Sequence, residues 1–106
     1  MNRVKIEPGI CGLITSAEFT SEDQQQVMIK ISTECEHIQK MSHALTEVDG
    51  FEECFGAYGS GDVFEQAQLF CPHKACPVPS GLIKGIEVAC GLALPKDVCM
   101  VIQKED

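Results

Sequence analysis

The sequence has no cluster of basic residues and no long hydrophobic run. Its 8 lysine and arginine residues stand singly among 16 acidic residues, which gives a formal net charge of -8. Nucleic-acid affinity depends on phosphate neutralisation, so this composition excludes DNA and RNA as expected partners. No apolar run approaches the roughly 18 residues of a membrane span, and no secretion signal opens the chain. We therefore expect a soluble, cytoplasmic protein with no membrane partner.

The motifs of several large enzyme classes are also missing. The chain contains no glycine-rich phosphate loop, dinucleotide fingerprint, nucleophile elbow or HExxH helix, so nucleotide hydrolysis, NAD chemistry and zinc proteolysis have no local support. What the sequence does contain is cysteine, with seven in 106 residues. An odd number cannot pair completely within one chain, and the cytoplasm keeps thiols reduced. Free thiols or metal ligands are therefore expected rather than disulfides.

The strand patterns begin at the N-terminus. A length of 106 residues with 44% hydrophobic content suits one domain with a single core, residues 1–106. Apolar and polar residues alternate at 4–7, which predicts a short strand. The runs 13–20 and 25–32 follow the same period of two around a polar turn, and this pattern predicts a hairpin.

Helical patterns follow the hairpin. Thr33 and Glu36 have capping-box spacing, which predicts a helix that ends at Asp49 and Gly50. Its apolar stripe has spacings of three and four and consists of Ile38, Met41, Leu45 and Val48. Residues 51–61 are rich in glycine and aromatics and are predicted to form a loop.

The rest of the chain predicts two more helices and a strand. Asp62 begins a short helix that ends at Cys71, and a further helix runs from Pro79 or Ser80 to Gly91. The β-branched and apolar run 97–102 predicts a final strand. These elements together predict an α+β fold, a mainly antiparallel sheet of three to four strands with two or three helices on one face.

Three cysteines stand at the ends of predicted elements, where small domains build binding sites. Cys11 lies in the turn Gly9-Ile10-Cys11-Gly12, Cys35 opens the first helix, and Cys76 precedes the last helix. Glycines let the backbone around Cys11 bend so that groups converge on an ion, and a helix start favours the thiolate of Cys35. The alternative interpretation is structural, with a tight turn at Cys11 and a partly buried Cys35.

A denser candidate is the segment Cys71-Pro72-His73-Lys74-Ala75-Cys76. It brings two thiols and one imidazole within six residues, a mixture that zinc and iron accept. The alternative is that Cys71 completes an apolar helix face and that His73 is solvated.

The other cysteines have weaker patterns. Cys90 continues the apolar stripe of the last helix and Cys99 lies inside the predicted final strand, so both are predicted core residues. Cys54 lies in the predicted loop and stays unassigned.

The order of Cys11-Gly12 before the hairpin, Cys35 after it and Cys76 before the last helix resembles the IscU/NifU-type iron-sulfur cluster scaffolds. The resemblance implies one metal-binding corner built from Cys11, Cys35 and Cys76, with His73 nearby. The chain differs from that pattern at Leu13, which follows Gly12 where the scaffolds have aspartate. Several of its phrases are also similar to a small prokaryotic family of cysteine-containing proteins of similar size.

Three functions remain open at this point. The first is binding of zinc or an iron-sulfur cluster by Cys11, Cys35 and Cys76, with His73 or Cys71 as fourth ligand, as in a scaffold or carrier. The second is a thiol enzyme or sulfur carrier with Cys35 or Cys76 as nucleophile and His73 as base. The third is a non-catalytic interaction domain that uses the loop 51–61 as a contact surface. The sequence leaves open a protein partner and a homodimer.

Overall fold

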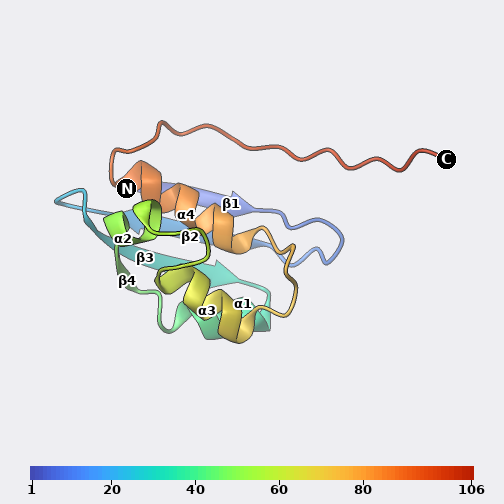
Figure 1. Cartoon of the computed structure of the whole chain (residues 1–106), viewed down its shortest axis with the longest axis horizontal. Coiled ribbons are helices and arrows are strands. Elements are labelled where there is room, and N and C mark those ends of the chain that lie inside the picture. The colour runs from blue at the N-terminus through green and yellow to red at the C-terminus, as the bar shows by residue number, and fades with distance from the viewer.

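The computed structural model describes all residues, Met1–Asp106, as a four-stranded antiparallel sheet covered by four helices (Figure 1). The strands lie side by side in chain order: β1 (Asn2–Ile6), β2 (Thr15–Thr20), β3 (Gln26–Thr33) and β4 (Glu47–Asp49). The helices are α1 (Glu36–Ser42), α2 (Gly50–Phe55), α3 (Asp62–Phe70) and α4 (Val78–Ala89). The predicted α+β class is confirmed, with one helix more than expected. None of these helices is both long and apolar enough to traverse a bilayer.

The predicted hairpin is present as β2 and β3. Side chains alternate between the two faces of β3, so Val27 and Ile29 lie in the core. Met28 and Lys30 point to the other face and are exposed. Phe19 of β2 pairs with Ile29 of β3 in the antiparallel register and is fully buried. One face of the sheet is therefore apolar and the other polar, and the helices cover the apolar face.

Helix α4 packs closely on β1 and β2. Its buried stripe includes Leu82 and Ile86, which were predicted from the spacing of apolar residues. Between them lies Gly85, and a β-carbon added there would overlap the ring of Phe19. The missing side chain lets the helix backbone approach the sheet.

The first helix is shorter than predicted. It ends at Ser42, so the predicted stripe is divided: Leu45 is buried in a turn and Val48 lies in β4. Thr33 is also not the cap, because Cys35 occupies that position and Thr33 Oγ1 accepts the Cys35 N–H instead. A single buried apolar residue such as Val48 fits the helical period and a short strand equally well, so the spacing alone assigned it to the helix.

The predicted loop 51–61 begins with a helix. Asp49 does not end the preceding helix but caps α2, because its carboxylate accepts the N–H groups of Phe51 and Glu52. Aspartate is a favoured N-cap residue, so the signal was present in the sequence.

The predicted final strand at 97–102 is wrong. Residues 91–106 are all exposed, and no hydrogen bond involves a residue after Leu92. Figure 1 shows this segment passing α4 and extending well beyond the body. A strand is completed by hydrogen bonds from a neighbouring strand, and local propensity cannot supply them. We call residues 93–106 the tail.

We expect Gly85→Ala to destabilise the protein. Alanine raises helix propensity by about 1 kcal/mol, but overpacking against a fully buried ring costs about 1–3 kcal/mol. Thermal or urea unfolding should show a net loss of up to about 2 kcal/mol. Lys84→Ala, at an exposed position of the same helix, is the control and should change stability little. Equal stability of the two variants would contradict the packing described here.

Candidate functional site

One end of the sheet collects the ends of six elements. There β1 ends, β2 begins and β3 ends, because Thr15 pairs with both Ile6 and Thr33. The start of α1, the end of α3 and the start of α4 lie at the same end of the molecule (Figure 1). The connecting segments 7–14, 34–35 and 71–77 carry every predicted ligand residue.

Cys11 is exposed on the connection between β1 and β2. Gly9 and Gly12 flank it with φ of 98° and 70°, and the Gly12 N–H donates to the Gly9 carbonyl at 3.0 Å. Such left-handed conformations favour glycine. The connection is tied to the segment before α1, because the Glu34 N–H donates to the Ile14 carbonyl and the Ile14 N–H to Glu34 Oε1, both at 3.2 Å.

Cys35 is held by the end of the sheet. Its N–H donates to Thr33 Oγ1 at 3.1 Å, and the Thr33 hydroxyl bonds that of buried Thr15 at 2.7 Å. The Cys35 side chain is half-buried and packs against the hydrophobic core. The thiol is thus placed by residues of β2 and β3.

Cys71 and Cys76 are organised by the main chain of His73. The Cys71 thiol donates to the His73 carbonyl at 3.5 Å, and the Cys76 N–H donates to the same oxygen at 3.1 Å. The His73 residue is itself exposed. In this structure His73 contributes its carbonyl oxygen to the segment.

The thiols of Cys71 and Cys35 lie near enough to Cys76 to affect its pKa, and we call these three residues the thiol cluster. Burial raises the pKa of Cys76 to about 11, and both Cys71 and Cys35 contribute to this rise. A hydrogen bond from the main-chain amide of Val78 opposes the rise. Charged neighbours shift a pKa when they lie close. The fold therefore brings Cys35 to a segment that begins 36 positions later in the chain.

Of the predicted ligands, the structure groups Cys35, Cys76 and Cys71 and leaves Cys11 at the same end but outside the cluster. All seven cysteines are free thiols. No three His, Cys, Asp or Glu side chains stand in an arrangement that could hold a metal ion. The donor chemistry fits zinc or iron, whereas the geometry is not preformed.

The remaining cysteines lie elsewhere. Cys90 is buried, as predicted, and lies so close to Gly50 that a β-carbon there would overlap its sulfur. Cys99 is exposed on the tail, so its assignment to the core is wrong. Cys54 is half-buried on α2, and burial, followed by Glu87 and Cys90, raises its pKa to about 12.

Sequence reasoning missed the role of Glu53. This buried side chain of α2 accepts the N–H groups of Asp62 and Val63, both at 2.7 Å, and so caps α3. Burial raises the pKa of Glu53 against these two hydrogen bonds, which lower it. A cavity of about 320 Å³ lies beside it, lined in part by Cys54 and Tyr58. No local pattern indicates a cap supplied from ten residues earlier.

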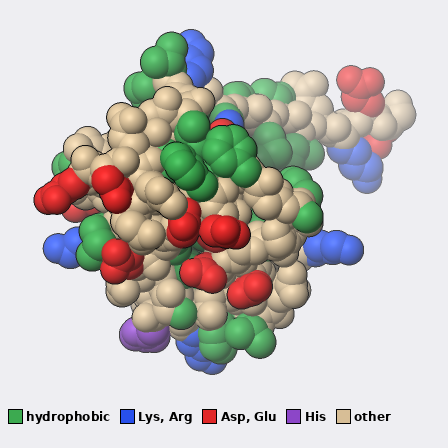
Figure 2. Space-filling model, turned by 60° about the vertical axis from the view of Figure 1, so that its left-hand side comes forward, with side chains coloured by type: hydrophobic (Ala, Val, Ile, Leu, Met, Phe, Trp, Pro, Cys, Tyr) green, Lys and Arg blue, Asp and Glu red, His purple; other side chains and the backbone are tan.

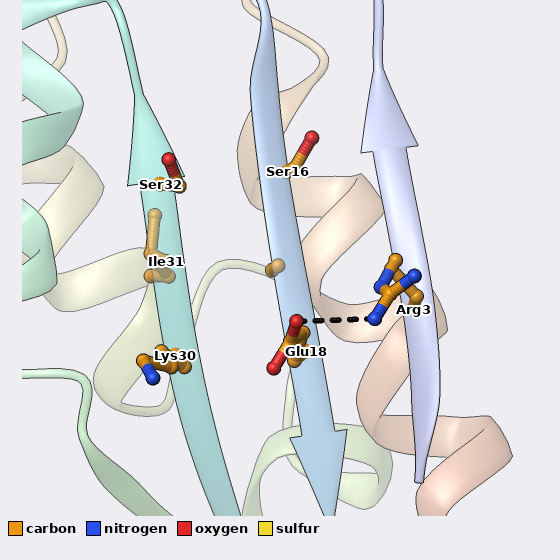
Figure 3. Close-up of a pocket in the computed structure, with 7 residues that line it drawn as sticks. Arg3, Ser16, Glu18, Lys30, Ile31 and Ser32 are labelled. Carbon is orange, nitrogen blue, oxygen red and sulfur yellow. Dashed lines mark hydrogen bonds and ion pairs between the residues drawn. The ribbon is translucent and has the colours of Figure 1, made fainter.

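The uncovered face of the sheet has a shallow hollow of about 210 Å³ (Figure 3). Arg3, Glu18 and Lys30 line it together with two serines, and Figure 3 shows these side chains on the side away from the helices. Arg3 is paired with Glu18 at 3.2 Å. The hollow therefore presents a mixed polar surface, on which Arg3 and Glu18 are paired and Lys30 takes part in no ion pair.

Comparison with known families gives one match. The model of the Family of unknown function (DUF6951) matches residues 2–102. The chain belongs to this family. The match to DUF6951 spans every strand and helix of the fold and continues along the tail to Ile102. No curated protein matches the chain, and no solved structure does.

The half-buried thiol of Cys54 predicts a loss of stability in alkali. A cysteine ionises ordinarily near 9.0, whereas folded Cys54 keeps its proton up to about 12. Its contribution to stability is therefore complete below pH 9 and is lost as the pH rises toward 12, because ionisation favours the unfolded chain. Between pH 9 and 11, the free energy of unfolding should fall less steeply with pH for Cys54→Ala than for Cys99→Ala, the exposed control. Equal slopes would contradict the burial of this thiol.

Proposed function

We propose that this protein binds a thiolate-ligated metal centre, zinc or an iron-sulfur cluster, through Cys11, Cys35 and Cys76 with Cys71 as the fourth ligand. The observation that carries the proposal is that Cys35, Cys71 and Cys76 pack against the same core at one end of the sheet, while Cys11 lies on a connection at that end. We favour Cys71 over His73 because the Cys71 thiol belongs to the cluster, whereas His73 takes part through its carbonyl.

The chain would supply three half-buried sulfurs and one exposed sulfur. Cys35, Cys71 and Cys76 pack against the core, while Cys11 lies in an exposed glycine turn. A tetrahedral thiolate site requires metal–sulfur distances of about 2.3 Å, so the segments 9–12 and 71–77 would have to close on the bound ion. Both are connections between elements, which move more readily than the strands and helices.

The difference in exposure favours a carrier or scaffold over a structural metal site. A structural zinc is enclosed by four permanent ligands, but here the Cys11 sulfur stands in solvent and can release the centre to a partner. The chain order of the cysteines, which resembles the IscU/NifU-type scaffolds, supports the same interpretation. Seven free thiols also fit a reducing compartment such as the cytoplasm.

The two other functions have different support. A nucleophilic role for Cys76 is disfavoured, because a pKa of about 11 keeps the thiol protonated at neutral pH. A non-catalytic interaction domain is favoured by aromatic exposure on α2 and the following loop, where Phe51, Phe55 and Tyr58 are 42%, 68% and 93% exposed. We retain this interaction domain as the second candidate.

Cobalt titration tests the metal proposal. Protein purified without oxygen should bind Co²⁺ with thiolate-to-metal charge-transfer absorption, and Zn²⁺ should displace the cobalt and remove the band. Cys35→Ser and Cys76→Ser should each lose most of the band. Reconstitution with ferrous iron and sulfide, followed by visible absorption and iron analysis, distinguishes an iron-sulfur cluster from a zinc site.

Three matched variants assign the ligands. Cys99→Ser removes an exposed thiol of the tail and should leave the cobalt spectrum unchanged, whereas Cys11→Ser and Cys71→Ser should weaken the band. His73→Ala should have no effect, because it retains the carbonyl oxygen. Absence of thiolate absorption in the unaltered protein would overturn the proposal, and a loss in His73→Ala would replace Cys71 by His73 as fourth ligand.

Metal binding should release protons at neutral pH. The pKa of Cys76 is about 11, so the ligand must lose a proton when it coordinates, and affinity should rise about tenfold per pH unit for each proton displaced. Calorimetric Zn²⁺ titration between pH 6 and 8, in two buffers of different ionisation enthalpy, measures the number released. A pH-independent affinity would show that Cys76 is not a ligand.

A further inference from the structure

The tail has the composition of a buried strand but is in contact with solvent. Residues 98–102 are Val, Cys, Met, Val and Ile, an apolar run on both sides of an extended chain. The exposed fractions of Val98, Met100, Val101 and Ile102 are 63%, 74%, 75% and 92%. Such a run is typical of a strand and not of a segment in contact with solvent.

The tail is free of its own body. Leu92 donates the last hydrogen bond of the chain, to the Glu87 carbonyl at 2.9 Å, and all residues beyond it are exposed. Figures 1 and 2 show the tail projecting away from the domain, with hydrophobic side chains along its course and charged ones near its end. The molecule consequently measures 50 Å along its longest axis and 28 and 26 Å along the others.

The sheet has a free edge of matching length. Strand β1 pairs only with β2, so the outer side of its five residues has no strand neighbour. The other edge is poorer, because β4 has three residues and continues directly into α2. Unpaired edge strands are templates for strand addition from another chain.

We propose that residues 98–102 of one copy add as a fifth strand to β1 of a second copy, and that the two copies exchange tails reciprocally. Every chain carries both the free edge and the apolar strand, so a twofold dimer satisfies both in each copy. Reciprocal exchange also buries two tails instead of one. The total buried surface is therefore nearer to the lower limit of stable complexes, about 1,200 Å².

Three observations support a second copy as the occupant. The tail is directed away from its own domain, it carries no hydrogen bond to that domain, and its five-residue apolar run equals β1 in length. The family match also includes this run and ends at its last residue, Ile102, which indicates that the tail belongs to the shared domain. This inference does not depend on metal binding.

Light scattering coupled to size exclusion tests the exchange. The protein should elute with twice the 11.5 kDa mass of one chain, and Val98→Asp/Val101→Asp should reduce that mass about twofold while the helical circular dichroism is retained. Gln103→Asp/Lys104→Gln makes the same change in net charge outside the apolar run and should remain dimeric. The residues changed lie outside the core, so both variants should fold.

Hydrogen exchange locates the paired strands. In the dimer, alternate amides of residues 98–102 and of β1 should be protected, and both sets should lose protection in Val98→Asp/Val101→Asp. A monomer with a protected tail would overturn the proposal in favour of pairing with its own β1. A monomer with an unprotected tail, or a dimer that both double variants leave intact, would overturn strand exchange altogether.

Discussion

The structure depends on the close approach of α4 to the apolar face of the sheet. The fully buried ring of Phe19 lies where Gly85 has no side chain, so the helix backbone can come near β2. Helix α4 also packs on β1, so it lies over both strands at this edge of the sheet. The start of α4, and with it Cys76, is thereby brought to the end of the sheet at which β3 delivers Cys35.

The thiol cluster combines this geometry with unfavourable electrostatics. Burial resists ionisation of the Cys76 thiol, and Cys71 and Cys35 oppose a negative charge on it, so the pKa of Cys76 stands near 11. The formal net charge of -8 adds to the cost of negative charge at the site. A bound cation would offset both effects, so the thiols would favour a metal centre more than free nucleophilic chemistry.

The same sheet explains both ends of the molecule. At one end of the sheet, the connections between elements carry the cysteines. At one edge of the sheet, β1 has no strand neighbour on its outer side. The tail provides extended apolar residues that the domain does not bury. A second copy would complete the sheet without disturbing the thiol cluster, because the free edge runs along β1 while the cluster lies beyond the end of β3.

Those elements whose signals are local could be predicted from the sequence. Alternation in Val27 and Ile29 specified the β2–β3 hairpin, the stripe of Leu82 and Ile86 specified α4, and the break after Phe70 placed Cys71 at a helix end. It also indicated that Cys11, Cys35 and Cys76 lie at element ends. Of these, Cys35 and Cys76 lie near each other together with Cys71, whereas Cys11 stays outside the cluster.

Tertiary structure alone decided the rest. Val48 lies in a strand because it pairs with Val27 of β3. Glu53 caps α3 because its carboxylate accepts the Val63 N–H. Residues 97–102 have no hydrogen-bonded strand neighbour within their own chain. Periodicity shows which side chains seek burial, but strand pairing and distant caps depend on groups far along the chain. Those groups become neighbours only when the helices have packed onto the sheet.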